Sequence, residues 1–109
     1  MRFYVEKEPS QDTIGQIAAI AQDYTADYFT ENVPDDVRSD LRFQRAAYLK
    51  KGNEIIAFLV FTCLDGCPQI TLLATKRVYA GQGYGKLLMR NFVSHITELG
   101  FRSIEVMTV

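Results

Sequence analysis

The sequence predicts an α/β or α+β fold built on a mixed, mostly antiparallel sheet. One observation is a nearly continuous run of Ile, Phe, Val and Leu over residues 54–64, which is typical of a central strand buried on both faces. Another is a strand–helix–strand pattern over residues 69–109, whose right-handed crossover would make the two strands parallel. A length of 109 residues suits one compact domain, so we expect residues 1–109 to form a single domain.

The first strand and the first helix follow from local spacing. Residues 2–7 alternate in polarity and predict a strand, which a Pro-Ser pair then ends. Ser10 or Thr13 is a suitable N-cap for the helix that follows. Apolar side chains recur at helical spacing over residues 14–28, so we expect the helix to occupy this stretch.

A loop, a short helix and a hairpin come next. Pro34 interrupts the helical pattern, so we expect a loop over residues 31–36 and a short helix that begins near Pro34 or Asp35. Residues 46–50 predict a weak strand, and the Lys-Gly-Asn sequence after it predicts a hairpin turn into the central strand.

The C-terminal half continues the meander and ends in the crossover. A turn over residues 65–68 leads into a strand predicted for residues 69–78, and a helix is predicted for residues 83–99. Gly100 would end this helix, and residues 101–109 predict the last strand. The apolar stripe of the helix contains Leu88, Phe92, Ile96 and Leu99, with Gly85 among them to allow close packing on the sheet.

Composition and charge exclude several classes of function. The formal net charge of −1 argues against general nucleic-acid binding. No apolar run reaches membrane-spanning length and no signal-peptide pattern opens the chain, so we expect a cytoplasmic protein without membrane binding. Cys63 and Cys67 lack the CxxC spacing of a redox or zinc site, and with one histidine in the chain we expect no metal site.

Charged residues gather in two segments of opposite sign. Acidic residues crowd residues 23–40, whereas Lys76, Arg77, Lys86 and Arg90 surround a glycine-rich turn. Two solvated faces would explain this pattern. The functional alternative is an anionic cofactor at the basic end and a cationic acceptor at the acidic end.

The glycine-rich turn comes directly after the last strand of the meander. Gly81, Gly83 and Gly85 alternate there, and the unpaired backbone amides of a helix start favour an anion, above all a phosphate. A P-loop is excluded because Leu87 follows Lys86, and a dinucleotide fingerprint would need a third glycine in place of Lys86. A purely structural turn remains the alternative.

These residues resemble the motif of the Gcn5-related N-acetyltransferase (GNAT) family, which is Gln or Arg, two residues, Gly, one residue, and Gly or Ala. Gly83-Tyr84-Gly85 matches the glycine part, and Gln82 is similar to the family's approach to it. The order of predicted elements also resembles the family's fold.

Two features depart from the family pattern. Ala80 stands at the Gln or Arg position, so one side-chain contribution to the turn is missing. The chain ends at Val109, where family members continue through another helix and two more strands. The resemblance therefore implies a partial GNAT fold.

The resemblance implies acetyl-CoA as co-substrate. Its pantetheine arm would pair with the strand at Leu73, Ala74 and Thr75, and its pyrophosphate would lie on the turn amides. The implied cofactor-binding residues are Leu73, Thr75, Ala80, Gly81, Gln82, Gly83, Tyr84, Gly85 and Lys86.

The implied reaction is transfer of an acetyl group to a primary amine by direct attack on the thioester. A backbone amide near Leu73 or Thr75 would stabilise the oxyanion. A lysine-like amine has a pKa of about 10.4 and must lose a proton, which requires a base. Glu105 is the candidate, because its surroundings resemble a strand segment that carries a basic glutamate in some family branches; an ordinary exposed glutamate is the alternative.

Several alternatives stay open. A non-catalytic acyl-CoA-binding or interaction module, or an inactive fragment of a longer acetyltransferase, would carry the same residues. Tyr24, Tyr28 and Phe29 would either line an acceptor site or belong to the core. The acceptor is a small-molecule or protein amine, and an uncovered edge at the last strand predicts self-association as a homodimer.

Overall fold

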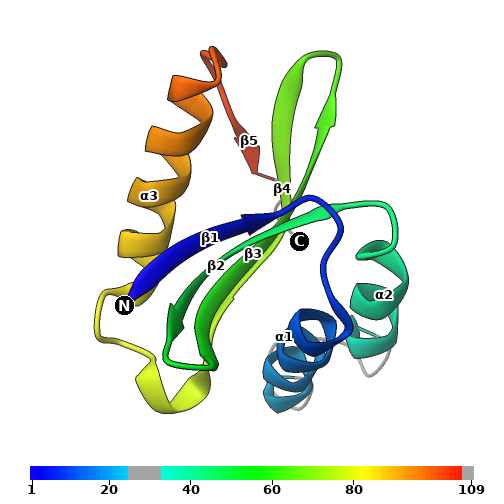
Figure 1. The fold of residues 1–109 in the computed structure, drawn as a ribbon, viewed down its shortest axis with the longest axis vertical. Helices are drawn as coiled ribbons and strands as arrows, with labels where there is room; N and C mark the ends of the chain where they lie inside the picture. Colours follow the sequence, from blue (N-terminus) through cyan, green and yellow to red (C-terminus); the bar gives the residue numbers. More distant parts are fainter. Residues whose placement is uncertain (25–32, 107–109) are drawn as a thin grey trace.

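The computed structural model describes residues 1–24 and 33–106 of the chain. The strands form one sheet in the order β1-β2-β3-β4-β5 (Figure 1). The first three pairings are antiparallel and β4 pairs with β5 in parallel, so the expected mixed, mostly antiparallel sheet is confirmed. The elements are β1 (Arg2–Glu6), α1 (Gln11–Asp23), α2 (Val33–Asp40), β2 (Arg45–Lys51), β3 (Glu54–Leu64), β4 (Cys67–Thr75), the short 3₁₀ helix η1 (Arg77–Tyr79), α3 (Tyr84–Glu98) and β5 (Glu105–Val106).

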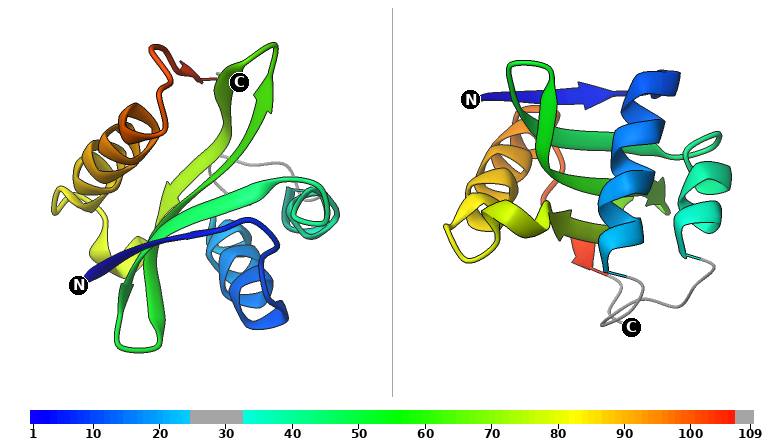
Figure 2. Two further views of the ribbon diagram at one scale, coloured as in Figure 1. Left: turned by 45° about the horizontal axis from the view of Figure 1, so that its top comes forward. Right: turned by 90° about the horizontal axis from the view of Figure 1, so that it is seen from below.

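Helices cover both faces of the sheet. α1 and α2 pack on one face and α3 on the other, which Figures 1 and 2 show from three directions. Along β3, Phe58 and Val60 belong to the core under α1 and α2, whereas Ala57 and Leu59 belong to the core under α3. The expected central strand, buried on both faces, is thus confirmed.

A hydrogen-bonded group fixes the link between β1 and α1. Ser10 caps α1 by accepting a hydrogen bond from the Thr13 amide at 3.2 Å. Glu6 accepts hydrogen bonds from the Thr13 hydroxyl at 2.9 Å, the Tyr48 hydroxyl at 2.5 Å and the Ser10 amide at 2.9 Å. Because Thr13 and Tyr48 are buried, the carboxylate supplies partners that these hydroxyls need.

This group also shifts two pKa values. Burial acts to raise the pKa of Glu6, but the hydrogen bonds from Tyr48, Ser10 and Thr13 outweigh it, so the pKa is lowered. Burial and the hydrogen bond to Glu6 together raise the pKa of Tyr48 to about 12. Both shifts favour the native pairing of a carboxylate with a neutral phenol.

Three expected boundaries are wrong. α2 begins at Val33, one residue before the expected start near Pro34 but inside the loop expected over residues 31–36, because a proline in the first turn of a helix loses no intrahelical hydrogen bond. β4 ends at Thr75, three residues before position 78, because the chain then turns into η1. Within the strand expected over residues 101–109, the structure assigns Glu105–Val106; residues 107–109 lie outside the described part.

The apolar stripe of α3 is confirmed with one exception. Leu88, Phe92 and Ile96 are buried, but Leu99 is 60 % exposed because α3 ends at Glu98 and the chain turns away. At Gly85 an added Cβ would lie 3.6 Å from the Thr75 hydroxyl oxygen, an ordinary contact. Close packing on the sheet therefore does not require a glycine there, contrary to expectation.

Candidate functional site

The outer edge of β4 presents backbone groups that no described strand pairs with beyond Ile70. The Lys76 amide donates to the Ile56 carbonyl at 2.7 Å, so residues at even positions of β4 near this end bond with β3. Leu73 and Thr75 lie between these positions, and their N–H and C=O groups therefore point away from β3. β5 pairs with β4 at Gln69 and Ile70, so no strand in the described residues covers the edge beyond them.

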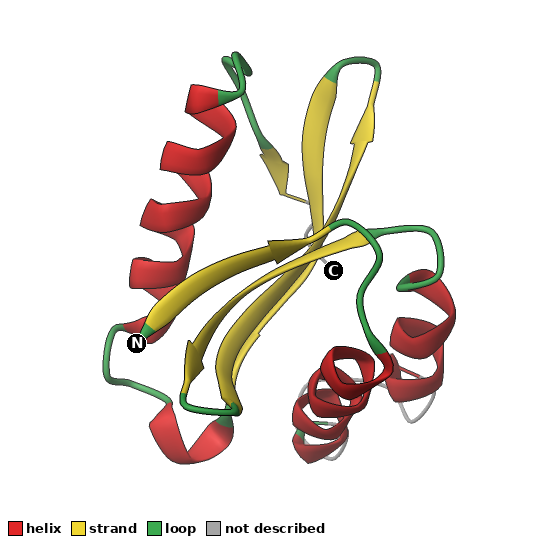
Figure 3. Cartoon of the chain, in the orientation of Figure 1, coloured by secondary structure: helices red, strands yellow, loops and turns green. Residues whose placement is uncertain are grey.

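The turn after β4 carries backbone amides toward the same edge. Figure 3 shows η1 and its flanking loops carrying the chain from β4 to α3. Gly81 and Gly83 have φ values of +77° and +86°, a left-handed conformation that L-residues adopt only with strain. Gly83 is the N-cap of α3 and forms no side-chain cap, so the first-turn amides of α3 have no intrahelical acceptor. Such amides form an anion site.

A cleft of about 360 Å³ joins the strand edge to the glycine turn. Among the residues expected to bind cofactor, it brings together Leu73, Thr75, Ala80, Gly81 and Gly85. The four others, Gln82, Gly83, Tyr84 and Lys86, belong to the same turn but do not line the cleft. Its wall is thus half strand edge and half turn, the two parts expected to hold an extended arm and a phosphate.

Tyr24 completes the cleft from the end of α1. Its hydroxyl donates a hydrogen bond of 2.5 Å to the Thr75 carbonyl, and the Arg77 guanidinium lies 5.2 Å from the centre of its ring. The sequence placed Tyr24 on a helix, but helical spacing carries no signal for a contact with β4. Tyr28 and Phe29, the other aromatic residues expected near an acceptor, lie outside the described residues.

The basic character of the turn is only partly confirmed. Lys76 forms an ion pair with Glu54 of β3, and this hydrogen bond raises the pKa of Lys76. Its charge is therefore matched within the protein. Lys86 and Arg90 are exposed on α3 and have no ion-pair partner among the described residues, so no described carboxylate neutralises their charges.

The candidate base Glu105 lies beside β4, away from the glycine turn. It is exposed, and its carboxylate accepts a hydrogen bond of 2.8 Å from the Gln69 side chain. Gln69 and Thr75 are about 20 Å apart along an extended strand. Glu105 thus lies where the described pairing of β4 with β5 begins. The part of β4 between this pairing and the glycine turn has no described strand beside it.

The order of the elements and the mixed sheet are those expected of a GNAT fold. The chain belongs to the acetyltransferase (GNAT) family, whose model matches residues 15–109. The expected family and enzyme class are thereby confirmed. No curated protein sequence matches the chain.

Solved structures share the fold at low sequence identity. The ribosomal-protein-alanine N-acetyltransferase of Brucella melitensis biovar Abortus 2308 has a TM-score of 0.73 and 14 % identity, covering 100 % of this chain and 81 % of its own. A GNAT family acetyltransferase from Brucella melitensis, solved with acetyl-CoA, has a TM-score of 0.72 and 14 % identity, and the match covers 99 % of this chain and 77 % of that protein. An aminoglycoside acetyltransferase from an uncultured soil metagenomic sample has a TM-score of 0.70 and 18 % identity, and the match covers 99 % of this chain and 77 % of that protein.

The residues that the structure describes, 1–24 and 33–106, contain neither a candidate membrane span nor a metal-binding group. None of their helices combines the length and apolar character needed to cross a membrane. In the same residues, no three His, Cys, Asp or Glu side chains are grouped so that they could hold a metal ion.

Proposed function

We propose that this protein transfers an acetyl group from acetyl-CoA to a primary amine. The observation that carries the proposal is the single cleft wall formed by the outward-facing backbone of Leu73 and Thr75 and by the turn at Ala80, Gly81 and Gly85. The amide groups of the pantetheine arm would pair with the strand edge as an added strand does. The pyrophosphate would lie on the amides that follow Gly83, near Lys86.

The reaction needs no covalent bond to the protein. The amine nitrogen attacks the thioester carbon, the C–S bond breaks, and CoA leaves as the thiol after protonation. An outward-facing amide of Leu73 or Thr75 would stabilise negative charge developing on the carbonyl oxygen. Glu105 is the proposed base, taking the amine proton through water.

The acceptor is proposed to be a cationic small-molecule or protein amine. Asp23 ends α1, and α2 carries Asp35 and Asp36 in its first turn, so this end of the α1–α2 face is acidic. A positively charged amine would be attracted to it, whereas nucleic acid would be repelled. Aminoglycoside acetyltransferases among the structures of similar fold act on amines of this kind, which supports the proposal.

Two measurements test the function together. Titration with CoA, followed by amide chemical shifts, should perturb residues 73–75 and 81–86. A thiol-detection assay with a panel of amines should release free CoA only when the correct amine is present. Perturbed shifts without turnover of any amine would favour a non-catalytic acyl-CoA-binding module, for which Ala80 in place of Gln or Arg is the supporting observation.

Location and assembly complete the proposal. We propose a cytoplasmic location, which the free thiols of Cys63 and Cys67 support, because thiols usually stay reduced in that compartment. Self-association through the β5 side of the sheet is proposed because Val106 there is 54 % exposed. Sedimentation velocity at increasing concentration tests it, and a constant monomer would contradict it.

A further inference from the structure

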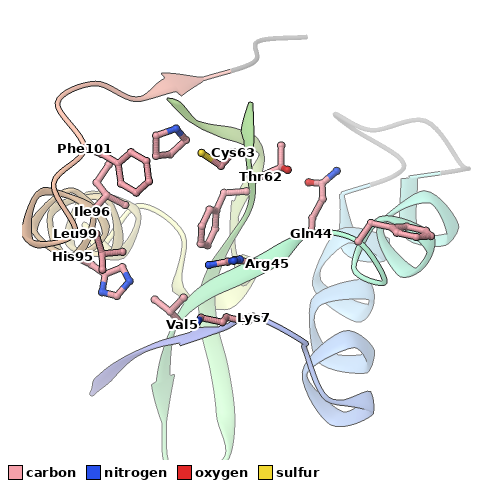
Figure 4. Close-up of a pocket in the computed structure, with 13 residues that line it drawn as sticks. Val5, Lys7, Gln44, Arg45, Thr62, Cys63, His95, Ile96, Leu99 and Phe101 are labelled. Atoms are coloured by element: carbon pink, nitrogen blue, oxygen red, sulfur yellow. The ribbon is translucent and has the colours of Figure 1, made fainter. Parts of the chain in front are cut away.

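A second pocket lies on the α3 face, near the start of β4 (Figure 4). Its volume is about 540 Å³, within the range usual for small-molecule sites. The end of β1, the start of β2, the β3–β4 hairpin and the last turns of α3 surround it. It shares no lining residue with the acetyl-CoA cleft, which lies at the other end of β4.

The floor of this pocket is apolar. Phe61 and Ile96 are 8 % and 3 % exposed and form its base, and Phe101 and Pro68 extend it. Leu99, whose 60 % exposure departs from the stripe of α3, also lines the pocket. Because Phe61 and Ile96 expose little surface to water, an apolar ligand body would gain mainly by covering Leu99, in proportion to the area covered.

Basic side chains surround this floor. Lys7 follows β1, Arg45 opens β2 and His95 lies on α3, so three elements separated in sequence each supply one basic group. Figure 4 shows them together on the side of the pocket opposite Phe101 and Cys63. No lining residue is acidic, and none of the three basic groups forms an ion pair with another described residue.

We propose that this pocket binds a small amphipathic carboxylate, with an aromatic or aliphatic body and one negative charge. The body lies on the Phe61–Ile96 floor. The carboxylate pairs with the guanidinium of Arg45, which is suited to two parallel hydrogen bonds, and with Lys7 beside it. An amine of the same shape is repelled, so the pocket is distinct from an acceptor site for cationic amines.

A matched pair of probes tests the charge requirement. 2-Naphthoate and 2-naphthylmethylamine share the same apolar body and differ in the sign of their charge. Titration of the whole chain, followed by amide chemical shifts, should show naphthoate binding with shifts at His95 and Phe101. The amine should bind at least tenfold more weakly, and the amides of residues 81–86 should not respond to either probe.

Variants then separate a local contact from general electrostatics. Arg45→Gln should weaken naphthoate binding about tenfold, the loss typical of one charge-assisted pair. Lys51→Gln is the matched control, because it removes an exposed positive charge at the other end of β2 and should leave binding unchanged. A thermal unfolding curve for each variant establishes that it is folded.

Cys63 provides an independent reporter in the unmodified protein. It is an exposed thiol that lines the pocket, so bound naphthoate should slow its alkylation by iodoacetamide severalfold, as read by peptide mass spectrometry. The proposal is overturned if the amine binds as tightly as naphthoate, or if Lys51→Gln weakens binding as much as Arg45→Gln. It is also overturned if naphthoate neither shifts these amides nor protects Cys63 at about 5 mM.

Discussion

Alanine at two neighbouring glycines should change stability in opposite directions. At Gly83, with φ +86°, nothing lies within 4 Å of an added Cβ, so the cost of Gly83→Ala is backbone strain of about 1–2 kcal/mol. At Gly85 the backbone is helical and an added Cβ meets the Thr75 hydroxyl at an ordinary 3.6 Å. Gly85→Ala should therefore raise the free energy of unfolding by about 0.5–1 kcal/mol, because alanine has a higher helix propensity than glycine.

The two variants should also differ in CoA binding. Strain at Gly83 would be relieved by moving the amides that follow it, so Gly83→Ala should weaken CoA binding about tenfold or more, which is about 1.4 kcal/mol. Gly85→Ala leaves those amides in place and occupies a position where the motif accepts alanine, so binding should change less than twofold. Gly83→Val should abolish binding, because its larger side chain also blocks the approach to the turn.

Thermal unfolding by circular dichroism and calorimetric CoA titration measure both effects. At about 4 °C per kcal/mol, Gly85→Ala should raise the melting temperature by about 2–4 °C and Gly83→Ala should lower it by about 4–8 °C. If both variants shift the melting temperature in the same direction, the backbone description of the turn is wrong. If Gly83→Ala binds CoA as the parent does, the phosphate site lies elsewhere.

Three other predictions concern the turn, the base and the link between β1 and α1. Ala80→Arg restores the family side chain at the cleft and should tighten CoA binding about fivefold, or about 1 kcal/mol; unchanged affinity would mean a differently shaped turn. Glu105→Gln should lower kcat at neutral pH by about 100-fold, with CoA affinity retained and a partial recovery at higher pH; an unchanged kcat would remove Glu105 as the base. Because folding lowers the pKa of Glu6, this group stabilises the protein above its unfolded pKa, and that stability is lost as the pH falls through its folded pKa. Because folding raises the pKa of Tyr48, this group stabilises the protein below pH 10, and that stability is lost as the pH rises toward about 12. Urea denaturation at several pH values should show both losses; Glu6→Gln should flatten the acid one, and an unaltered acid slope in this variant would contradict the assignment.

Local rules were enough for the order and type of the elements. The apolar run of β3, the stripe on α3 and the Ser10 cap each depend on neighbours within a few residues, and all three are present in the structure. The turn glycines could be recognised because alternating glycines before a helix are a local signal of an anion site. The parallel pairing of β4 with β5 followed from the strand–helix–strand connection between them.

Contacts between distant segments required the tertiary structure. The Lys76–Glu54 ion pair and the Tyr24–Thr75 hydrogen bond join residues 22 and 51 positions apart, and spacing within one element carries no information about them. Spacing within one element likewise carries no information about the pocket that Arg45 and His95 both line.

The sequence alone therefore determined the family, the element order and the turn that would hold a phosphate, because each depends on short-range pattern. Only the tertiary structure decided which residues of that turn line the cleft, which cations stay unpaired and where a second pocket opens. These depend on how the two faces of the sheet are covered, and that is set by packing among segments far apart in the chain.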